Sequence, residues 1–235
     1  MEYELIRTKR KTIAIYIRDG RVIVRAPMRA PVREIDAFVF SKLDWIEKHL
    51  ESEARRNELR SAFKLDYGSI VLFLGREYSV ESTHGENTMY FPPGLSSVES
   101  THGENTMYFP PGLSREQLRR KLIRYYKEQA QTYIADRASH FAKHMNVSPA
   151  NIRIGSAKRS WGSCTSYGRL TFSWRLIMAP PEAVDYVVVH ELAHLRQLNH
   201  SPGFWAIVAR IMPDWKDRRK ILRLLQKRLS VETWE

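Results

Sequence analysis

Two histidines and a glutamate within residues 190–194 have the spacing of a metal site with its own catalytic base. The segment reads His-Glu-Leu-Ala-His, so His190 and His194 are four residues apart and Glu191 directly follows the first. Residues at this spacing lie on nearly the same face of an α-helix, so both imidazoles can reach one ion. Zn²⁺ accepts neutral imidazole nitrogen, and Glu191 can then take a proton from the water that the ion activates. We therefore expect hydrolytic chemistry with Glu191 as catalytic residue and one zinc ion as cofactor.

His200 is the third metal ligand that we expect. A continuous helix would turn His200 roughly 80° away from His190 and about 15 Å along the axis, so the helix must stop and the chain double back. Asn199 suits this reversal because asparagine tolerates the left-handed conformation that closes helices. The spacing H-x3-H-x5-H is that of the metzincin motif, with Gln197 where that motif has glycine, so the turn must differ. Three ligands beside a glutamate favour an open catalytic site over a closed structural one.

A helix and the strands before it must position these residues. Pro180 and Pro181 start the helix that carries the motif. Before it, residues 169–175 alternate like a strand, residues 155–168 are typical of a loop, and residues 151–154 form a short strand. Residues 114–145 form the longest helix, with Ser114 and Gln117 as a capping box and apolar residues at helical spacing.

The N-terminal part of the chain is rich in β signals. Residues 12–17 and 22–24 flank Asp19 and Gly20, a pair that favours a type I′ hairpin turn. A helical pattern begins at Pro31 with a break at Ser41, and a second pair of strands surrounds Gly75. We predict an α+β fold, a zincin-like metallopeptidase domain with an N-terminal β-rich lobe. The predicted domains are residues 1–114, the lobe with its helix, and residues 115–235, the catalytic domain.

One segment of the predicted lobe is duplicated without change. Residues 79–96 read SVESTHGENTMYFPPGLS, and residues 97–114 repeat this segment in tandem. A natural structural repeat drifts in sequence, so identity indicates a very recent or an engineered duplication. Two copies are too few to build a solenoid. Each copy can form one hairpin, and we expect one copy to be surplus to the fold and to extend from a sheet edge.

Composition limits the compartment and the partners. The chain of 235 residues has one cysteine, so an intrachain disulfide is excluded. It shows no bilayer-length apolar run and no signal-type N-terminus, so we expect a cytoplasmic protein without a membrane partner. The net charge of +12 attracts DNA, nucleotides or acidic protein, or it simply solvates basic helices. The same two interpretations apply to the basic residues of the last helix, which include Arg219 and Arg223.

Four segments resemble the YgjP-like metallopeptidase family, which is related to SprT-like and other zincin peptidases. They are residues 159–176 (RSWGSCTSYGRLTFSWRL), 180–189 (PPEAVDYVVV), 190–205 (HELAHLRQLNHSPGFW) and 212–220 (MPDWKDRRK). The resemblance covers the chain apart from the extra copy of the duplicated segment and is most specific within residues 115–222. It implies a zincin fold with His190, His194 and His200 as metal ligands and Glu191 as catalyst. Some relatives of the family act on proteins crosslinked to DNA.

The family pattern also draws attention to residues 159–176. Trp161 and Cys164 flank a glycine in a loop, where they can border the substrate cleft. Cys164 is better explained as a small buried residue than as a nucleophile, because no neighbouring residue in the sequence activates it. Residues 169–174 are either the strand on which an extended peptide lies or a plain core strand.

Together these observations predict a zinc-dependent hydrolase that cleaves peptide bonds in a peptide or protein substrate. A different class is a metal-dependent nucleotide pyrophosphohydrolase, although the chain has no Walker-type loop to cradle phosphates. A third interpretation is a DNA-associated protein with a structural metal site, which predicts salt-sensitive DNA binding without hydrolysis.

Overall fold

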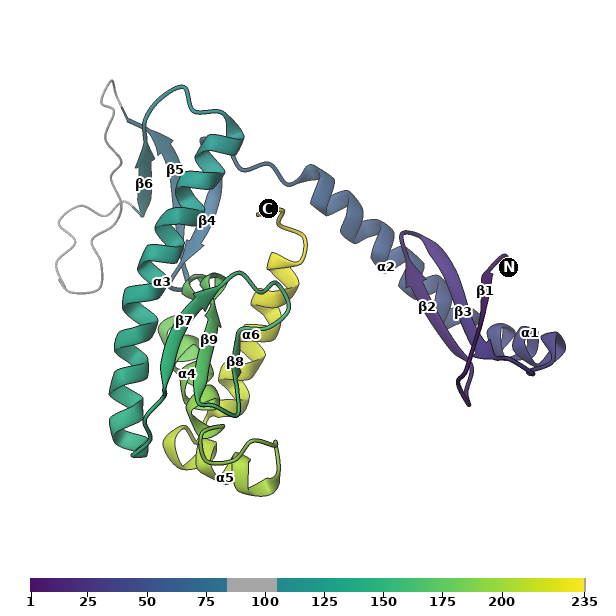
Figure 1. Cartoon of the computed structure of the whole chain (residues 1–235). Coiled ribbons are helices and arrows are strands. Elements are labelled where there is room, and N and C mark those ends of the chain that lie inside the picture. The colour runs from purple at the N-terminus through teal and green to yellow at the C-terminus, as the bar shows by residue number, and fades with distance from the viewer. Residues whose placement is uncertain (84–104, 235) are drawn as a thin grey trace. The chain divides into compact units, whose positions relative to one another are not determined.

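The computed structural model describes residues 1–83 and 105–234, and its elements have the α+β composition that the sequence predicts (Figure 1). The chain forms two compact units, which are described separately. The first comprises Met1–Phe63 with Ser230–Thr233, and the second comprises Lys64–Leu229 with Trp234–Glu235.

The N-terminal unit is a three-stranded sheet that packs against helical residues. Its elements are β1 (Glu4–Thr8), β2 (Ala14–Arg18), β3 (Arg21–Pro27), α1 (Val32–Phe40) and α2 (Leu43–Ala62). β3 is central, parallel to β1 and antiparallel to β2. Asp19 and Gly20 have φ of 50° and 72°, which confirms the predicted hairpin turn. The core joins β3 to both helices and consists of Val22, Val24, Ala26, Ile35, Val39 and Ile46.

The described part of the second unit contains two small sheets and four α-helices. Its elements are β4 (Ile70–Phe73), β5 (Arg76–Ser82), β6 (Thr106–Phe109), α3 (Arg115–Met145), β7 (Asn151–Gly155), β8 (Gly162–Cys164), β9 (Arg169–Ser173), the 3₁₀ helix η1 (Trp174–Met178), α4 (Pro181–Ala193), α5 (Pro202–Ile211) and α6 (Trp215–Leu229). α3 runs along this unit in Figure 1 and begins with the predicted capping box of Ser114 and Gln117. It ends at Asn146, whose φ of 49° is left-handed.

The β4–β5 hairpin is attached to the elements that lead into α4. Its turn donates two backbone hydrogen bonds to η1, from Leu74 to Ile177 (2.8 Å) and from Gly75 to Met178 (3.2 Å). Gly75 has φ of +76°, and a β-carbon there would lie 2.6 Å from Cβ of Pro180, so only glycine fits this position. These contacts explain why the structure divides the chain after Phe63. The division into residues 1–114 and 115–235 stays a prediction.

The duplicated segment contributes to one sheet from both of its copies. β5 ends within the first copy and β6 comes from the second, and the two strands pair in parallel. The hairpin that we expect within each copy would be antiparallel, and most of each such hairpin lies outside the described residues. A parallel pair needs a connection of about a dozen residues or more, and the sequence between Ser82 and Thr106 is long enough for one.

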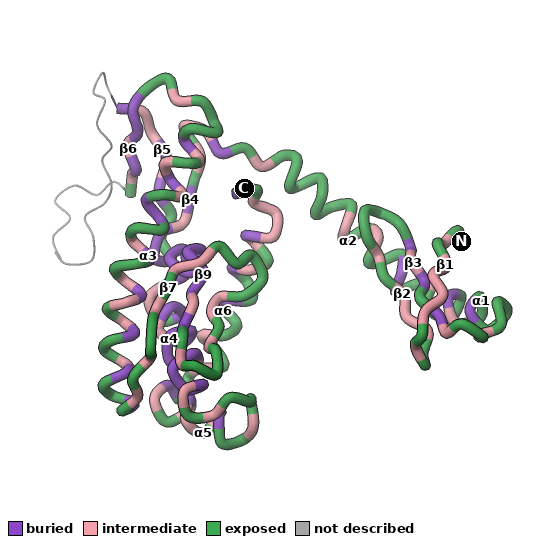
Figure 2. Tube along the Cα trace, in the orientation of Figure 1, coloured by how far each residue is buried: buried purple, intermediate pink, exposed green. Residues whose placement is uncertain are grey.

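Burial is greatest in η1, whose five residues are all buried, and in α4 (Figure 2). In α4, nine side chains from Ala183 to Ala193 are buried, and Val184, Val188 and Leu192 are fully enclosed. By contrast, Ile46 is the only buried residue of α2. Within residues 1–83 and 105–234, no helix combines the length and the apolar character needed to span a membrane.

Candidate metal centre

α4 carries the H-E-x-x-H segment and is fixed on several sides by neighbouring elements. It begins at Pro181 as predicted, because a proline in the first turn lacks only an N–H that has no helical partner there. The helix packs against α3, α5, α6 and β8. Arg137 on α3 donates two hydrogen bonds to Asp185 on α4, at 2.6 and 2.8 Å, so the axial position of α4 is set by a bidentate ion pair.

The chain reverses direction directly after α4. The backbone amides of Arg196 and Gln197 both donate to the carbonyl of Ala193 at 3.0 Å, which closes a tight turn. Arg196 also donates to the carbonyl of Met145 at 2.6 Å and so ties this turn to the end of α3. Nδ1 of His194 lies 3.1 Å from the carbonyl oxygen of Gln197. That contact leaves Nε2 of His194 available to a metal.

The predicted left-handed conformation of Asn199 is wrong. Its side-chain oxygen instead accepts hydrogen bonds from Nε2 of Gln197 (2.8 Å) and from the backbone amide of Ser201 (3.3 Å). The reversal is therefore built from side-chain hydrogen bonds and not from a positive φ. Among the described non-glycine residues, positive φ occurs at Asp19, Leu74 and Asn146.

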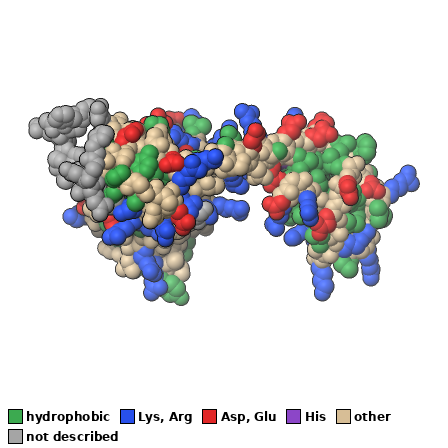
Figure 3. Space-filling model, turned by 90° about the horizontal axis from the view of Figure 1, so that it is seen from above, with side chains coloured by type: hydrophobic (Ala, Val, Ile, Leu, Met, Phe, Trp, Pro, Cys, Tyr) green, Lys and Arg blue, Asp and Glu red, His purple; other side chains and the backbone are tan. Residues whose placement is uncertain are grey.

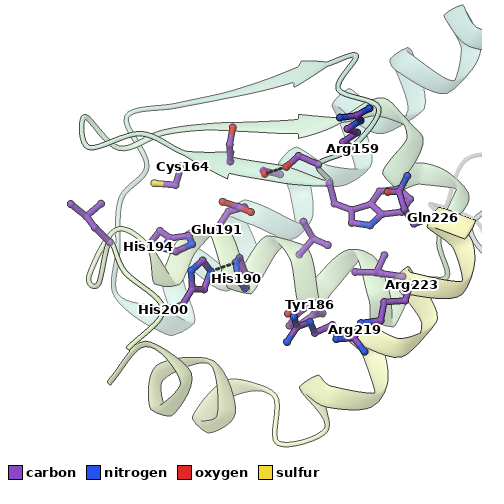
Figure 4. Close-up of a pocket in the computed structure, with 17 residues that line it drawn as sticks. Arg159, Cys164, Tyr186, His190, Glu191, His194, His200, Arg219, Arg223 and Gln226 are labelled. Carbon is purple, nitrogen blue, oxygen red and sulfur yellow. Dashed lines mark hydrogen bonds between the residues drawn. The ribbon is translucent and has the colours of Figure 1, made fainter. Parts of the chain in front are cut away.

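The reversal brings three imidazoles to one point, as Figure 4 shows. One ligand nitrogen from each of His190, His194 and His200 lies within 4.8 Å of the other two. Nε2 of His190 and Nε2 of His200 are 3.0 Å apart. Two nitrogens at tetrahedral positions around one zinc ion, each about 2.0–2.1 Å from it, would be roughly 3.3 Å apart. The three side chains thus have the geometry of ligands that share one cation.

Packing around the imidazoles keeps them in place and favours the neutral form of His190 and His194. The buried ring of Phe204 lies 4.9, 4.5 and 4.7 Å from the rings of His190, His194 and His200. Burial and the neighbouring histidines lower the pKa of His190 to about 3, and burial also lowers the pKa of His194. Neutral imidazole is the form that binds metal, so the donor set fits a divalent ion. Nδ1 of His190 is buried without a described hydrogen-bond partner, so packing alone sets that ring's orientation.

Glu191 is buried beside this centre. Its side chain faces β8, and burial raises the pKa of its carboxyl to about 7. Loss of hydration disfavours the carboxylate form, whereas a cation on the adjacent imidazoles would favour it again. The carboxyl is therefore suited both to accept and to release a proton near neutral pH.

Comparison with known proteins assigns the chain to a family. A family model described as "YgjP-like, metallopeptidase domain" matches residues 11–224. The chain belongs to the YgjP-like metallopeptidase family. Two solved structures are similar to the YgjP-like chain in part. The metallopeptidase zymogen abylysin of Pyrococcus abyssi is 24% identical with a TM-score of 0.37, covering 43% of this chain and 98% of its own. The zymogen jannalysin of Methanocaldococcus jannaschii is 22% identical with a TM-score of 0.35, covering 40% and 95%. No curated protein matches the chain.

A cleft of about 640 Å³ contains the three imidazoles and Glu191 of the YgjP-like chain. One wall is β8, which lies at the edge of its sheet because the strand order is β7-β9-β8. β9 is the central strand, so the hypothesis that residues 169–174 receive a substrate strand is wrong, and the core-strand alternative holds for them. The sheet edge that borders the cleft belongs to β8, a strand within the predicted loop. Its three residues, Gly-Ser-Cys, show no alternation of apolar and polar side chains.

Trp161 and Cys164 line the cleft, as the sequence predicts. Cys164 is half-buried rather than buried. Burial, and to a smaller extent the charge of Glu191, raises the pKa of its thiol. The thiolate is therefore disfavoured, which argues against a nucleophilic role.

Gly162 on β8 has no side chain and so leaves the space that the carboxyl group of Glu191 occupies. A β-carbon at Gly162 would lie 2.7 Å from both Cγ and Oε1 of Glu191, so the carboxyl would have to move. We expect Gly162→Ala to lower kcat by roughly 10²-fold while zinc content is kept, because small displacements of a catalytic group have effects of this size. Gly203→Ala is the control, since a β-carbon there meets nothing closer than 3.7 Å. Equal kcat for the two variants, at equal zinc content, would contradict this role of Gly162.

The sequence does not place Tyr186, Arg219 or Arg223 in the cleft, although it marks the two arginines as part of a basic helix that attracts anions. Tyr186 lies one helical turn before His190, and Arg219 and Arg223 come from α6 (Figure 4). The two arginines are four residues apart, so they share a helix face. That spacing is visible in the sequence, but only packing shows that the face borders this cleft.

Proposed function

We propose that the chain is a zinc-dependent peptidase that hydrolyses peptide bonds in the cleft beside β8. The observation that carries the proposal is the approach of three imidazole nitrogens within 4.8 Å of one another, next to a buried glutamate, in a chain of a metallopeptidase family. His190, His194 and His200 would hold the ion. Three protein ligands leave a fourth position for water or substrate, which is the arrangement of catalytic zinc.

Glu191 acts as the general base and then as the general acid. Zinc, when bound, supplies a water of lowered pKa and polarises the substrate carbonyl. Glu191 takes the proton from the attacking water at its carboxylate, holds it in a buried position and gives it to the leaving amine. The raised pKa of Glu191, about 7, suits a group that must do both at neutral pH. Gly162 keeps this carboxyl against β8.

The edge of β8 can align the substrate. Its partner β9 occupies one side, and the other side borders the cleft. An extended peptide can add to such an edge through main-chain hydrogen bonds, which bind many sequences in one register. The scissile carbonyl would then be presented to the imidazoles and Glu191 on α4.

Two other classes of function receive less support. A nucleotide hydrolase would need a phosphate cradle, and the sequence has no Walker-type loop. A nucleic-acid module predicts a continuous basic surface. On the face shown in Figure 3, the described lysine and arginine side chains are interspersed with acidic and apolar ones. A buried glutamate beside the imidazoles is also unnecessary in a structural metal site.

The proposal is tested by removal and return of the metal. Full-length protein treated with a chelator should lose hydrolysis of an unstructured protein substrate, and one equivalent of zinc should restore it. Nucleoside triphosphates and single-stranded DNA are assayed with the same preparation. Zinc-dependent hydrolysis of a nucleotide without cleavage of protein would favour the nucleotide class. Binding of DNA with no hydrolysis at any zinc concentration would refute the peptidase proposal.

A further inference from the structure

Beyond the metal centre, the charged lining of the cleft is almost entirely arginine. Arg159 lies near β8, and Arg219 and Arg223 lie on α6 (Figure 4). Glu191 is the one carboxylate among the lining residues, and the proposed mechanism already uses it. A cleft of this composition favours a negatively charged group on whatever it binds.

The two arginines of α6 have no acidic partner among the described residues. The carboxylates at the start of this helix are already paired, since Asp214 binds Arg218 at 2.9 Å and Asp217 binds Lys220 at 2.7 Å. Arg219 and Arg223 are four residues apart, where two like charges on a helix repel each other. An anion placed between them would relieve that repulsion and could accept hydrogen bonds from both guanidinium groups.

The arginines are close to the metal centre. Cζ of Arg219 lies 5.9 Å from the centre of the Trp205 ring. The centre of that ring is 5.7 Å from the ring of His200 and 5.9 Å from that of His190. The Trp205 side chain therefore lies between the Arg219 guanidinium and the candidate ligands His190 and His200. An extended peptide advances about 3.3–3.6 Å per residue, so a group bound at Arg219 belongs to a residue within roughly three positions of the scissile bond.

Tyr186 indicates that both guanidinium groups act on the same part of the cleft. Burial raises the pKa of Tyr186, and the charges of Arg219 and Arg223 oppose that rise. Tyr186 is one turn before His190 on α4, so the arginines lie toward the N-terminal half of the helix. Cys164 and Leu198 line the same cleft, and Figure 4 shows Cys164 on the opposite side of the imidazoles from Arg219.

We propose that Arg219 and Arg223 form a subsite for a carboxylate of the substrate, so that the cleft selects peptides with negative charge within about three residues of the scissile bond. This inference rests on the peptidase function proposed above. The carboxylate comes from an acidic side chain or from the C-terminus of the peptide. The planar guanidinium fork matches a carboxylate in two parallel hydrogen bonds, which gives the subsite its selectivity.

The experiment measures binding separately from turnover. Full-length Glu191→Gln protein loaded with zinc is titrated against three fluorescent peptides of equal length. One has internal glutamates and an amidated C-terminus, one is neutral with a free C-terminus, and one is neutral and amidated. We expect roughly 10-fold tighter binding of at least one carboxylate peptide than of the neutral amide, since hydrogen bonds to charged groups have about this effect. The first two peptides distinguish the sources of the carboxylate.

Variants then assign the preference to the two arginines. When Arg219→Gln and Arg223→Gln are both added to the Glu191→Gln protein, its affinities for the carboxylate peptide and for the neutral amide should become nearly equal. Lys220→Gln is the matched control, because it removes a charge from the same helix at a residue that does not line the cleft. Arg219→Glu with Arg223→Glu should reverse the preference toward a lysine-containing peptide. All three side chains are exposed on α6, so we expect each variant to fold, and thermal unfolding of each variant checks this.

Three results would overturn the subsite. The first is equal affinity of the protein for all three peptides. The second is an unchanged ratio of carboxylate-peptide to neutral-peptide affinity in the variant with both Arg219→Gln and Arg223→Gln. The third is a loss of DNA binding by this variant without any change in its peptide binding. Turnover by the unsubstituted zinc protein separates this inference from the peptidase proposal. Selective binding of acidic peptides without cleavage would refute the peptidase and leave the subsite. Cleavage of acidic and neutral peptides at equal kcat/KM, with equal binding, would refute the subsite and leave the peptidase.

Discussion

Glu191→Gln is expected to keep its zinc and its fold and to lose almost all of its hydrolytic activity. The amide is nearly the same size as the carboxyl and fills the same buried position against Gly162, so packing is preserved. It has no basic oxygen that can take a proton from water at neutral pH. General acid–base catalysis contributes roughly 10²–10⁴-fold, and we expect kcat to fall within this range. The measurement is kcat on a peptide substrate together with zinc content by elemental analysis.

Glu182→Gln provides the control for this substitution. Glu182 is an exposed glutamate in the first turn of the same helix and does not line the cleft. Its replacement should leave kcat unchanged and alter stability only by the small effect of one charge near a helix N-terminus, about 0.3–1 kcal/mol. If the Glu191→Gln protein turned over at the unsubstituted rate, another group would have to be the base.

His200→Ala is expected to remove tight zinc binding, and activity with it. His190 and His194 come from one helix and would remain, but two imidazoles are fewer than the three that a catalytic zinc site uses. Loss of outer-shell partners alone weakens metal binding by about 10–100-fold, so loss of a ligand should exceed 10²-fold. Zinc should also stop raising the melting temperature, because that stabilisation scales with the logarithm of metal concentration over Kd. Isothermal titration and thermal unfolding with and without zinc measure both effects.

His144→Ala is the matched control for the ligand substitution. His144 is exposed on α3, and its Nδ1 lies 2.9 Å from the carbonyl oxygen of His140 within the same helix. Its loss should leave zinc affinity and activity unchanged. Zinc affinity that is the same in His200→Ala and His144→Ala would show that His200 is not a ligand.

Much of the metal centre follows from local sequence. The spacing of His190 and His194 places both on one face of a helix, because an α-helix repeats every 3.6 residues wherever it occurs. Their separation from His200 requires a reversal, and the structure has one. The capping box at Ser114 and the hairpin turn at Asp19 and Gly20 are likewise set by contacts between near neighbours in the chain. Such features depend little on the rest of the fold, so sequence alone predicts them.

The turn at Asn199 marks the limit of that reasoning. Asparagine both tolerates a left-handed backbone and hydrogen-bonds to nearby backbone with its side chain. Both conformations suit a helix end, and no local feature of the sequence favours one over the other. In the structure the side-chain oxygen of Asn199 bridges Gln197 and Ser201. The contact of Arg196 with the end of α3 also holds the turn, and that contact joins residues far apart in the sequence.

The duplicated segment shows the same limit for strand pairing. One copy read by itself favours an antiparallel hairpin, since its turn residues are local. In the structure, β5 and β6 come from different copies and pair in parallel. Identical sequences cannot reveal which copy supplies a strand. The choice depends on the length of the connection and on the surface that the strand covers.

The sequence by itself determined the chemical groups and their helical spacing: three histidines, one glutamate, and two arginines four residues apart on a basic helix. Tertiary structure decided which other parts of the chain lie next to these groups. It made β8 rather than β9 the sheet edge that borders the cleft, set Gly162 against Glu191, and brought Arg219 and Arg223 to the cleft of the imidazoles. The physical reason is range: helix periodicity and capping act over three or four residues, whereas the edge of a sheet and the lining of a cleft depend on packing between segments distant in the chain.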